Sequence, residues 1–140
     1  MTFIVDSSVS LSWCFEDERT PATKALLERV GDSGAHVPQH WPLEVLNGLM
    51  MAERRQRIDT AKRQRLADFL RDLPITLDTE TTTQLWNATQ RLAERFRLTV
   101  YDAVYLELAQ RRHLPLATLD QEMRSAGAAL GVTLLGSDPA

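Results

Sequence analysis

Short apolar runs alternate with longer amphipathic segments along the chain. The runs are unbroken rather than alternating with polar residues, which is typical of strands buried on both faces of a parallel sheet. Strands are predicted at residues 2–6, 35–38, 74–77, 114–119 and 132–135. The first of these carries Phe3-Ile4-Val5 and runs directly into Asp6. Asp6 is therefore predicted at the carboxyl end of a central strand, where open α/β sheets bind their ligands.

The segments between these runs have apolar residues at helical spacing, as in Leu46, Leu49 and Met50. Helices are predicted at residues 8–15, 21–30, 41–57, 59–72, 79–96, 100–112 and 121–129. Residues 31–34 are expected to break the second helix, and residues 136–140 to form a frayed tail. Because strands and helices alternate, residues 1–140 are predicted to form one α/β domain. Its expected architecture is a three-layer α/β/α sandwich with a central parallel sheet of four to five strands.

The composition fits a globular domain, with 44% apolar and 25% charged residues in a chain of 140. No apolar stretch reaches the length of a membrane span, and the N-terminus lacks a basic region followed by an apolar one. We therefore expect a cytoplasmic protein without a membrane partner. Cys14 is the single cysteine, so an intrachain disulfide and a cysteine-based zinc site are excluded. It is expected to be a small buried hydrophobe on the first helix.

The basic residues are unevenly chosen, because all but Lys24 and Lys62 are arginine. The net charge of −3 is not typical of a nucleic-acid-binding domain. Arginine nevertheless favours bidentate contacts to phosphate. The arginines cluster at 54, 55 and 57, at 63 and 65, and at 111 and 112. Each cluster fits either a phosphate-binding surface or an ordinary solvated helix face, and the sequence leaves both open.

Four carboxylates occupy strand ends or first helical turns. Asp6 closes the first strand, and Asp120 directly follows the strand at 114–119. Glu44 lies in the first turn of the helix after the second strand, and Asp102 in the first turn of the 100–112 helix. All four positions can project toward the carboxyl edge of one sheet. Simpler roles are also open, since Asp120 can cap a helix and first-turn acids interact favourably with the helix dipole. Asp6 is harder to explain in this way, because an ionised carboxylate after a buried strand needs partners.

Convergence of these acids has a chemical consequence. Two carboxylates about 4 Å apart repel by roughly 4 kcal/mol at an effective dielectric of about 20. A bound proton or cation must relieve that repulsion. All-oxygen ligation favours Mg²⁺ or Mn²⁺ over zinc, and such sites suit phosphoryl chemistry. His36 and His40 are four residues apart, but Pro38 lies between them where strand passes into turn, so no metal role is expected for them.

The chain resembles the PIN-domain ribonucleases, and most closely the VapC-type toxins of bacterial toxin–antitoxin pairs. The resemblance rests on four segments in order: Ile4-Val5-Asp6-Ser7-Ser8-Val9, Glu44-Val45-x-Asn47-x-Leu49, Tyr101-Asp102-Ala103-x-Tyr105-Leu106-x-Leu108-Ala109 and Leu116-Ala117-Thr118-Leu119-Asp120. Together they cover nearly the whole chain.

This resemblance implies an endoribonuclease toxin that depends on Mg²⁺ or Mn²⁺ and hydrolyses RNA phosphodiesters with activated water. The metal-binding catalytic acids would be Asp6, Glu44, Asp102 and Asp120. Ser8 and Thr118 match the accessory hydroxyls of the family, which orient acids or water. Asn47 either supports Glu44 or is an ordinary polar helix residue. The expected partners are an RNA substrate, a small cognate antitoxin whose C-terminal segment covers the active groove, and a second copy of the chain in a homodimer.

Three other classes are less consistent with the residues. A phosphatase of the haloacid dehalogenase type needs a second Asp two residues after the first, where this chain has Ser8. A receiver domain needs a lysine at a late strand end, but Lys24 and Lys62 fall in predicted helices. A catalytically inactive PIN-like module that binds RNA or protein is the non-enzymatic alternative, and the complete set of acids argues against it.

Overall fold

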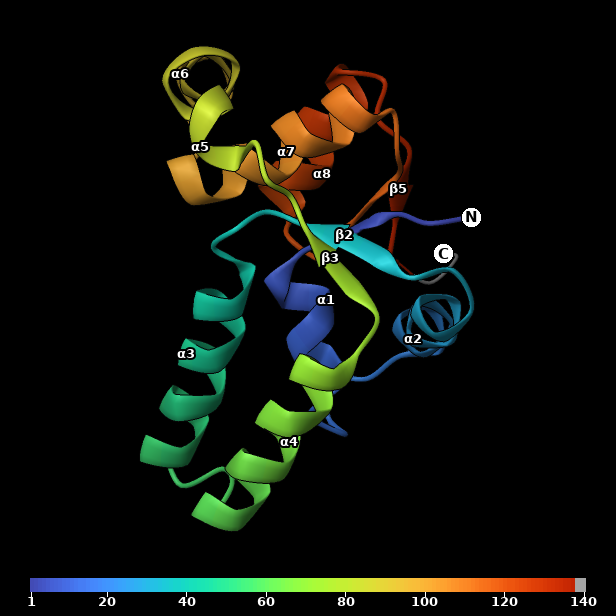
Figure 1. Cartoon of the computed structure of the whole chain (residues 1–140), viewed down its shortest axis with the longest axis vertical. Coiled ribbons are helices and arrows are strands. Elements are labelled where there is room, and N and C mark those ends of the chain that lie inside the picture. Colours follow the sequence, from blue (N-terminus) through green and yellow to red (C-terminus); the bar gives the residue numbers. More distant parts are fainter. Residues whose placement is uncertain (138–140) are drawn as a thin grey trace.

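The computed structural model describes residues 1–137 and contains one five-stranded sheet (Figure 1). Its spatial order is β3 (Ile75–Leu77), β2 (Ala35–Val37), β1 (Ile4–Val5), β4 (Leu116–Ala117) and β5 (Leu134–Leu135). Every neighbouring pair is parallel. The strands are shorter than predicted, although single backbone hydrogen bonds continue past their ends, as from Asp6 N to Ala117 O at 3.1 Å.

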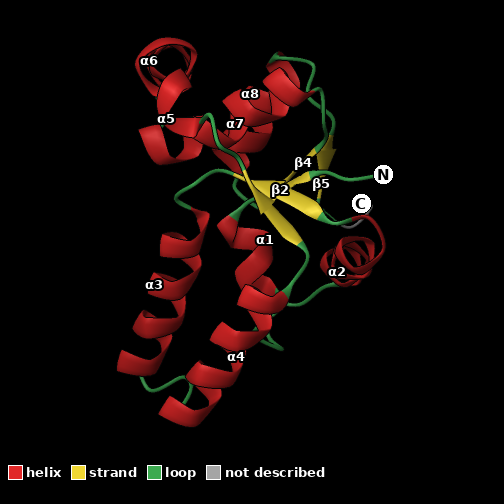
Figure 2. Ribbon diagram, in the orientation of Figure 1, coloured by secondary structure: helices red, strands yellow, loops and turns green. Residues whose placement is uncertain are grey.

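Helices cover both faces of the sheet, which confirms the predicted α/β/α architecture. They are α1 (Ser7–Ser12), α2 (Pro21–Ser33), α3 (Trp41–Arg54), α4 (Thr60–Asp72), α5 (Thr81–Gln84), η1 (Leu85–Thr89), α6 (Gln90–Phe96), α7 (Val100–Arg112) and α8 (Gln121–Ala129). Helices α1 to α4 lie on one side of the sheet and α5 to α8 on the other (Figure 2). Within residues 1–137, none of these helices has the length and apolarity needed to cross a membrane.

Two predicted helices differ from those in the structure. The break expected at residues 31–34 is confined to Gly34, where φ is 71° and an added Cβ would lie 2.9 Å from Pro74 O. The helix expected at 79–96 is divided by the π-helical turn η1. A π turn holds more residues than an α turn, so it shifts the faces of the helix. Trp86, which lies in this turn, is 77% exposed.

The core is centred on β1 and α7. Ile4 and Val5 have no exposed surface, and the residues of α7 from Ala103 to Ala109 are all buried. A helix buried on most of its circumference must pack on several sides, and α7 contacts β1, β4, α6 and α8. Cys14 is buried, as expected, although it lies just beyond α1. Burial raises the pKa of its thiol to about 12, so Cys14 is unreactive.

Gly136, directly after β5, packs near the end of β4. Gly136 is buried, and an added Cβ there would lie 3.3 Å from Thr118 O. The predicted frayed tail spans residues 136–140, of which residues 138–140 lie outside the described part of the chain.

A buried ion-pair network fixes α7 to the end of β3. Arg111 Nη2 lies 2.7 Å from Asp78 Oδ2, and Arg111 Nε lies 2.8 Å from Glu107 Oε2. Both carboxylates have only 5% of their side chains exposed. Burial acts to raise the pKa of Asp78, but hydrogen bonds from Arg111 and Thr81 outweigh it, so that the pKa is lowered. Asp78 and Glu107 thus depend on one guanidinium.

Replacing this guanidinium should destabilise the fold. Arg111→Met would leave the carboxylates of Asp78 and Glu107 buried without their cation, which costs about 3–5 kcal/mol in comparable networks. Urea unfolding followed by circular dichroism measures this change. The matched control is Arg112→Met, on the neighbouring exposed residue of the same helical turn, where about 0.5 kcal/mol or less is expected. Equal losses in the two variants would contradict a special role for Arg111.

Candidate active site

The acids are organised around the point where strand order reverses. Strand β1 has β2 on one side and β4 on the other, which is the crevice where open α/β sheets bind ligands. Val5 pairs with Ala117, so Asp6 emerges beside Thr118. Asp120 follows two residues later, at the start of α8. Two strand ends far apart in sequence therefore place carboxylates at one edge, as predicted.

Asp6 is the most buried of the candidate acids, with 3% of its surface exposed. It caps α1, and its Oδ1 accepts hydrogen bonds from Val9 N at 3.0 Å and Ser8 Oγ at 2.7 Å. Burial raises the pKa of Asp6 to about 6, and the charge of Glu44 adds to this, while the hydrogen bonds from Thr118, Ser8 and Val9 act in the opposite direction. Ionising Asp6 thus carries a cost in free energy that its hydrogen bonds only partly offset.

Ser8 and Thr118 connect the two strand ends. Besides donating to Asp6, Ser8 Oγ accepts from Leu119 N at 3.0 Å. Thr118 Oγ1 accepts from Asp120 N at 3.1 Å, and its hydroxyl also bonds the Asp6 carboxyl. Both hydroxyls lie where an orienting role requires them.

Asp120 and Asp102 lie at the N-terminal ends of two helices. Asp120 caps α8, because its Oδ1 accepts a hydrogen bond from Met123 N at 3.0 Å. The capping role that the sequence left open is therefore present in the structure. A capping carboxylate keeps a second oxygen, so the cap does not preclude another ligand. Asp102 lies in the first turn of α7, capped by Thr99. Its pKa is raised by burial first and then by the charges of Asp120 and Glu44. The charges of Glu44 on α3 and Asp120 after β4 therefore both act on Asp102 of α7.

Glu44 has two neighbours that the sequence reasoning did not assign to the site. Tyr105 Oη donates to Glu44 Oε1 at 2.6 Å, and His40 Nε2 lies 3.3 Å from the same oxygen. Burial and the Glu44 charge raise the pKa of Tyr105 well above its usual value, so the phenol stays a donor. Spacing offered a signal for both, because Tyr105 lies three residues after Asp102 and His40 four before Glu44, on shared helical faces. A third omission is Glu122, which also raises the pKa of Asp102.

The acids are close enough to influence one another but are not arranged as a ligand cage. Across residues 1–137, no three His, Cys, Asp or Glu side chains form a group that could hold a metal ion. Asn47, one turn from Glu44, is exposed. Carboxylates that raise the pKa of their neighbours are nevertheless the donor set that a hard divalent cation prefers.

Several of the clustered arginines are paired with acids. Arg57 lies 3.2 Å from Asp17 and 3.0 Å from Glu18, and Arg63 lies 2.7 Å from Glu53. Arg111 belongs to the buried network described above. The cluster at 54–57 begins ten residues beyond Glu44, roughly 15 Å along α3. A solvated or ion-paired helix face is thus the better description of Arg57, Arg63 and Arg111.

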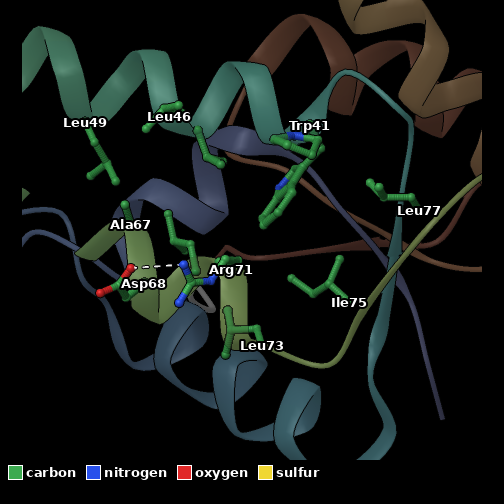
Figure 3. A pocket seen from close by; sticks show the side chains of 12 residues that line it. Trp41, Leu46, Leu49, Ala67, Asp68, Arg71, Leu73, Ile75 and Leu77 are labelled. Carbon is green, nitrogen blue, oxygen red and sulfur yellow. Dashed lines mark ion pairs between the residues drawn. The ribbon is translucent and has the colours of Figure 1, made fainter. Parts of the chain in front are cut away.

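An apolar groove opens between α3, α4 and β3, beside the acids (Figure 3). Its volume is about 390 Å³, and its walls include Trp41, Leu46 and Leu49 of α3 and Leu77 of β3. Leu46 and Leu77 are 45% and 46% exposed. The spacing of Leu46 on α3 predicted an apolar face, but half of that side chain faces the groove rather than the core.

Comparison with known proteins agrees with the arrangement of the strands. The family model for the PIN domain matches residues 3–129. A search of curated proteins finds no match.

Solved structures share the fold at low sequence identity. PAE2754 from Pyrobaculum aerophilum superposes with a TM-score of 0.70 at 20% identity, over 96% of this chain and 83% of its own. VapBC2 from Rickettsia felis bound to a DNA fragment from their promoter superposes with a TM-score of 0.66 at 14% identity, over 99% of this chain and 100% of its own. FitAcB from Neisseria gonorrhoeae superposes with a TM-score of 0.66 at 15% identity, over 96% of each chain. The family resemblance predicted from the four sequence segments is confirmed, and this chain belongs to the PIN-domain family.

Proposed function

We propose that this protein is an endoribonuclease dependent on Mg²⁺ or Mn²⁺ that acts as the toxin of a toxin–antitoxin pair. The observation that carries the proposal is that Asp6 and Asp120 lie at neighbouring strand ends, at the switch point of the sheet, with Glu44 and Asp102 near enough for their charges to interact. Membership of the PIN-domain family, whose members are generally nucleases, supports it. A fold that keeps four carboxylates at this edge, against their mutual repulsion, favours a cation there.

Each residue has a stated part in this proposal. Asp6, Glu44, Asp102 and Asp120 would hold the cation. When bound, such a cation supplies Lewis-acid chemistry that activates water and stabilises charge on the phosphate. Ser8 and Thr118 hold Asp6 and the Asp120 backbone in place. Tyr105 and His40 both contact Glu44 Oε1, so Oε2 would be the oxygen that helps to hold the cation. Cleavage would leave a 5′-phosphate and a 3′-hydroxyl.

The first test is cleavage of RNA by the purified protein. With Mn²⁺ present, the wild-type chain should cut single-stranded RNA, and EDTA should abolish the activity. Asp6→Asn, Asp102→Asn and Asp120→Asn should each lower the rate by at least about 100-fold, which corresponds to roughly 2.7 kcal/mol of transition-state stabilisation. Asp59→Asn is the control, because Asp59 also caps a helix through an Asp side chain but lies on α4, in the helical hairpin away from the sheet edge. Cleavage that survives EDTA would refute the metal dependence.

A second test reads the site through stability alone. Because the pKa of Asp6 rises from 3.8 to about 6 on folding, the folded state binds this proton more tightly than the unfolded state. In EDTA, the free energy of unfolding should therefore fall as pH increases from about 4 to above 6, by about 3 kcal/mol at 1.36 kcal/mol per pKa unit. Asp6→Asn keeps a good helix cap and removes the charge, so its stability should lack this decline.

Asp59→Asn again serves as the control for the pH test. The two caps have nearly the same backbone conformation, with φ −90° and ψ 174° at Asp59 and φ −90° and ψ 175° at Asp6, but Asp59 is exposed. It should retain the wild-type pH dependence. Adding Mn²⁺ at pH 7.5 should raise the melting temperature of the wild type and of Asp59→Asn but not that of Asp6→Asn. A wild type that Mn²⁺ leaves unchanged would instead favour the inactive PIN-like binding module.

The proposed partner is a small antitoxin, and a homodimer is a further expectation. The fold shared with VapBC2 and FitAcB, together with the resemblance to the VapC-type toxins, supports an antitoxin. So does the apolar groove, because Leu46 and Leu77 line it while about half exposed, a surface that a protein partner would cover. The groove begins at Trp41 and Pro42, within one helical turn of Glu44. A partner seated there would lie beside the acids.

The partner proposal is tested by co-expression with a small protein, if one is encoded next to this gene. Leu46→Glu places a charge in the groove and should weaken the complex at least tenfold in titration calorimetry, while RNA cleavage by the free chain is retained. Leu43→Glu is the matched control, since Leu43 lies on the same helix and is 72% exposed but does not line the groove. Equal weakening by both changes would place the partner elsewhere.

A further inference from the structure

Tyr101 presents a largely bare aromatic ring at the edge of the acidic site. It precedes Asp102 in the first turn of α7, and 65% of its surface is exposed. Consecutive helical residues point about 100° apart, so the ring flanks the Asp102 carboxylate rather than covering it.

The imidazole ring of His40 lies close to the Tyr101 ring. The two ring centroids are 5.9 Å apart with an interplanar angle of 41°, and the His40 ring lies 5.2 Å from that of buried Tyr105. His40 Nε2 is 3.1 Å from Tyr101 O and 3.3 Å from Glu44 Oε1. Both of these oxygens are acceptors, so Nε2 carries the hydrogen and the imidazole is held in one orientation. The ring of Tyr101 is thus joined, through His40, to one of the candidate acids.

We propose that Tyr101, supported by His40, is a stacking platform for one unpaired base of the RNA next to the cleaved phosphate. This inference rests on the proposed nuclease function and adds a positioning residue to it. The platform selects unpaired nucleotides, because a base within a duplex has both faces occupied by its neighbours and cannot stack on a side chain.

The charges around the site favour a base over a phosphate as the group that is recognised. The acids repel phosphate, and Arg57, Arg63 and Arg111 already pair with carboxylates. With these three arginines paired, uncharged contacts would add to the affinity for RNA near the acids. Stacking on an aromatic ring supplies such a contact, and it works for every base because each has a π face.

The test combines a side-chain change with a base change. Tyr101→Ala removes the ring but keeps the backbone oxygen that contacts His40, so the His40–Glu44 contact is preserved. With a 12-nucleotide single-stranded RNA and Mn²⁺, Tyr101→Ala should lower kcat/KM about 5- to 150-fold, mainly through KM. Tyr101→Phe and Tyr101→Trp should stay within about threefold of wild type. Trp86→Ala, which removes the other strongly exposed aromatic ring, should have no effect.

An abasic scan of the same RNA identifies the stacked base. In the wild type, one abasic position near the cleavage point should reproduce the loss caused by Tyr101→Ala. In Tyr101→Ala that abasic position should add nothing, because both changes remove one interaction. Additive losses at every position would overturn the proposal. So would a Tyr101→Ala variant that cleaves normally but loses self-association or partner binding, since the ring would then belong to a protein interface.

Binding of the same oligonucleotides by fluorescence anisotropy in EDTA separates the two proposals. A wild-type chain that binds with the predicted base dependence but never cleaves refutes the nuclease function and keeps the platform. A chain that cleaves with no difference between wild type and Tyr101→Ala refutes the platform alone. Absence of both binding and cleavage refutes both.

Discussion

The parallel pairing of β1 with β4 is the constraint on which the site depends. Its register sets Val5 beside Ala117, so the chain leaves both strands at the same level. Ser8 then bonds Asp6 on one side and Leu119 on the other, which joins segments 111 residues apart. Since Asp6 caps α1 and Asp120 caps α8, the carboxylates are fixed by backbone geometry rather than by flexible side chains. Rigid placement of this kind is what a site for a small cation needs.

The same rigidity has an electrostatic cost. Asp6 is buried at the end of a strand that is itself buried, and its pKa of about 6 reflects that loss of water. The pKa of Asp102 is raised by burial and also by the charges of neighbouring carboxylates. The fold offsets this cost elsewhere, through the apolar contacts of β1 with α7 and through Arg111, which secures the far end of α7. In the proposed function, a cation would recover the free energy that these ionised groups give up on folding.

Local patterns were enough to predict the strands, the fold class and the positions of Asp6 and Asp120 at neighbouring strand ends. Unbroken apolar runs identify buried strands, and the strand-end rule then places Asp6 and Asp120. What could not be predicted depends on which helices pack together. The contacts of Glu44 with Tyr105 and His40 bridge α3 and α7, and the ion pairs of Arg57 and Arg63 depend on where a loop and a second helix lie. The π turn that exposes Trp86 has no recognised signature in the sequence.

The first turn of α3 links the groove and the acids. Trp41 forms a wall of the groove, and its Nε1 donates to Ser10 Oγ at 2.9 Å, which in turn donates to Asp6 O at 2.7 Å. His40 and Glu44, on the same turn, face Tyr105 and Tyr101 instead. A partner in the groove and a base on Tyr101 would therefore contact different faces of one helical turn. Any shift of that turn moves Glu44, so occupation of the groove has a direct physical route to the acidic site.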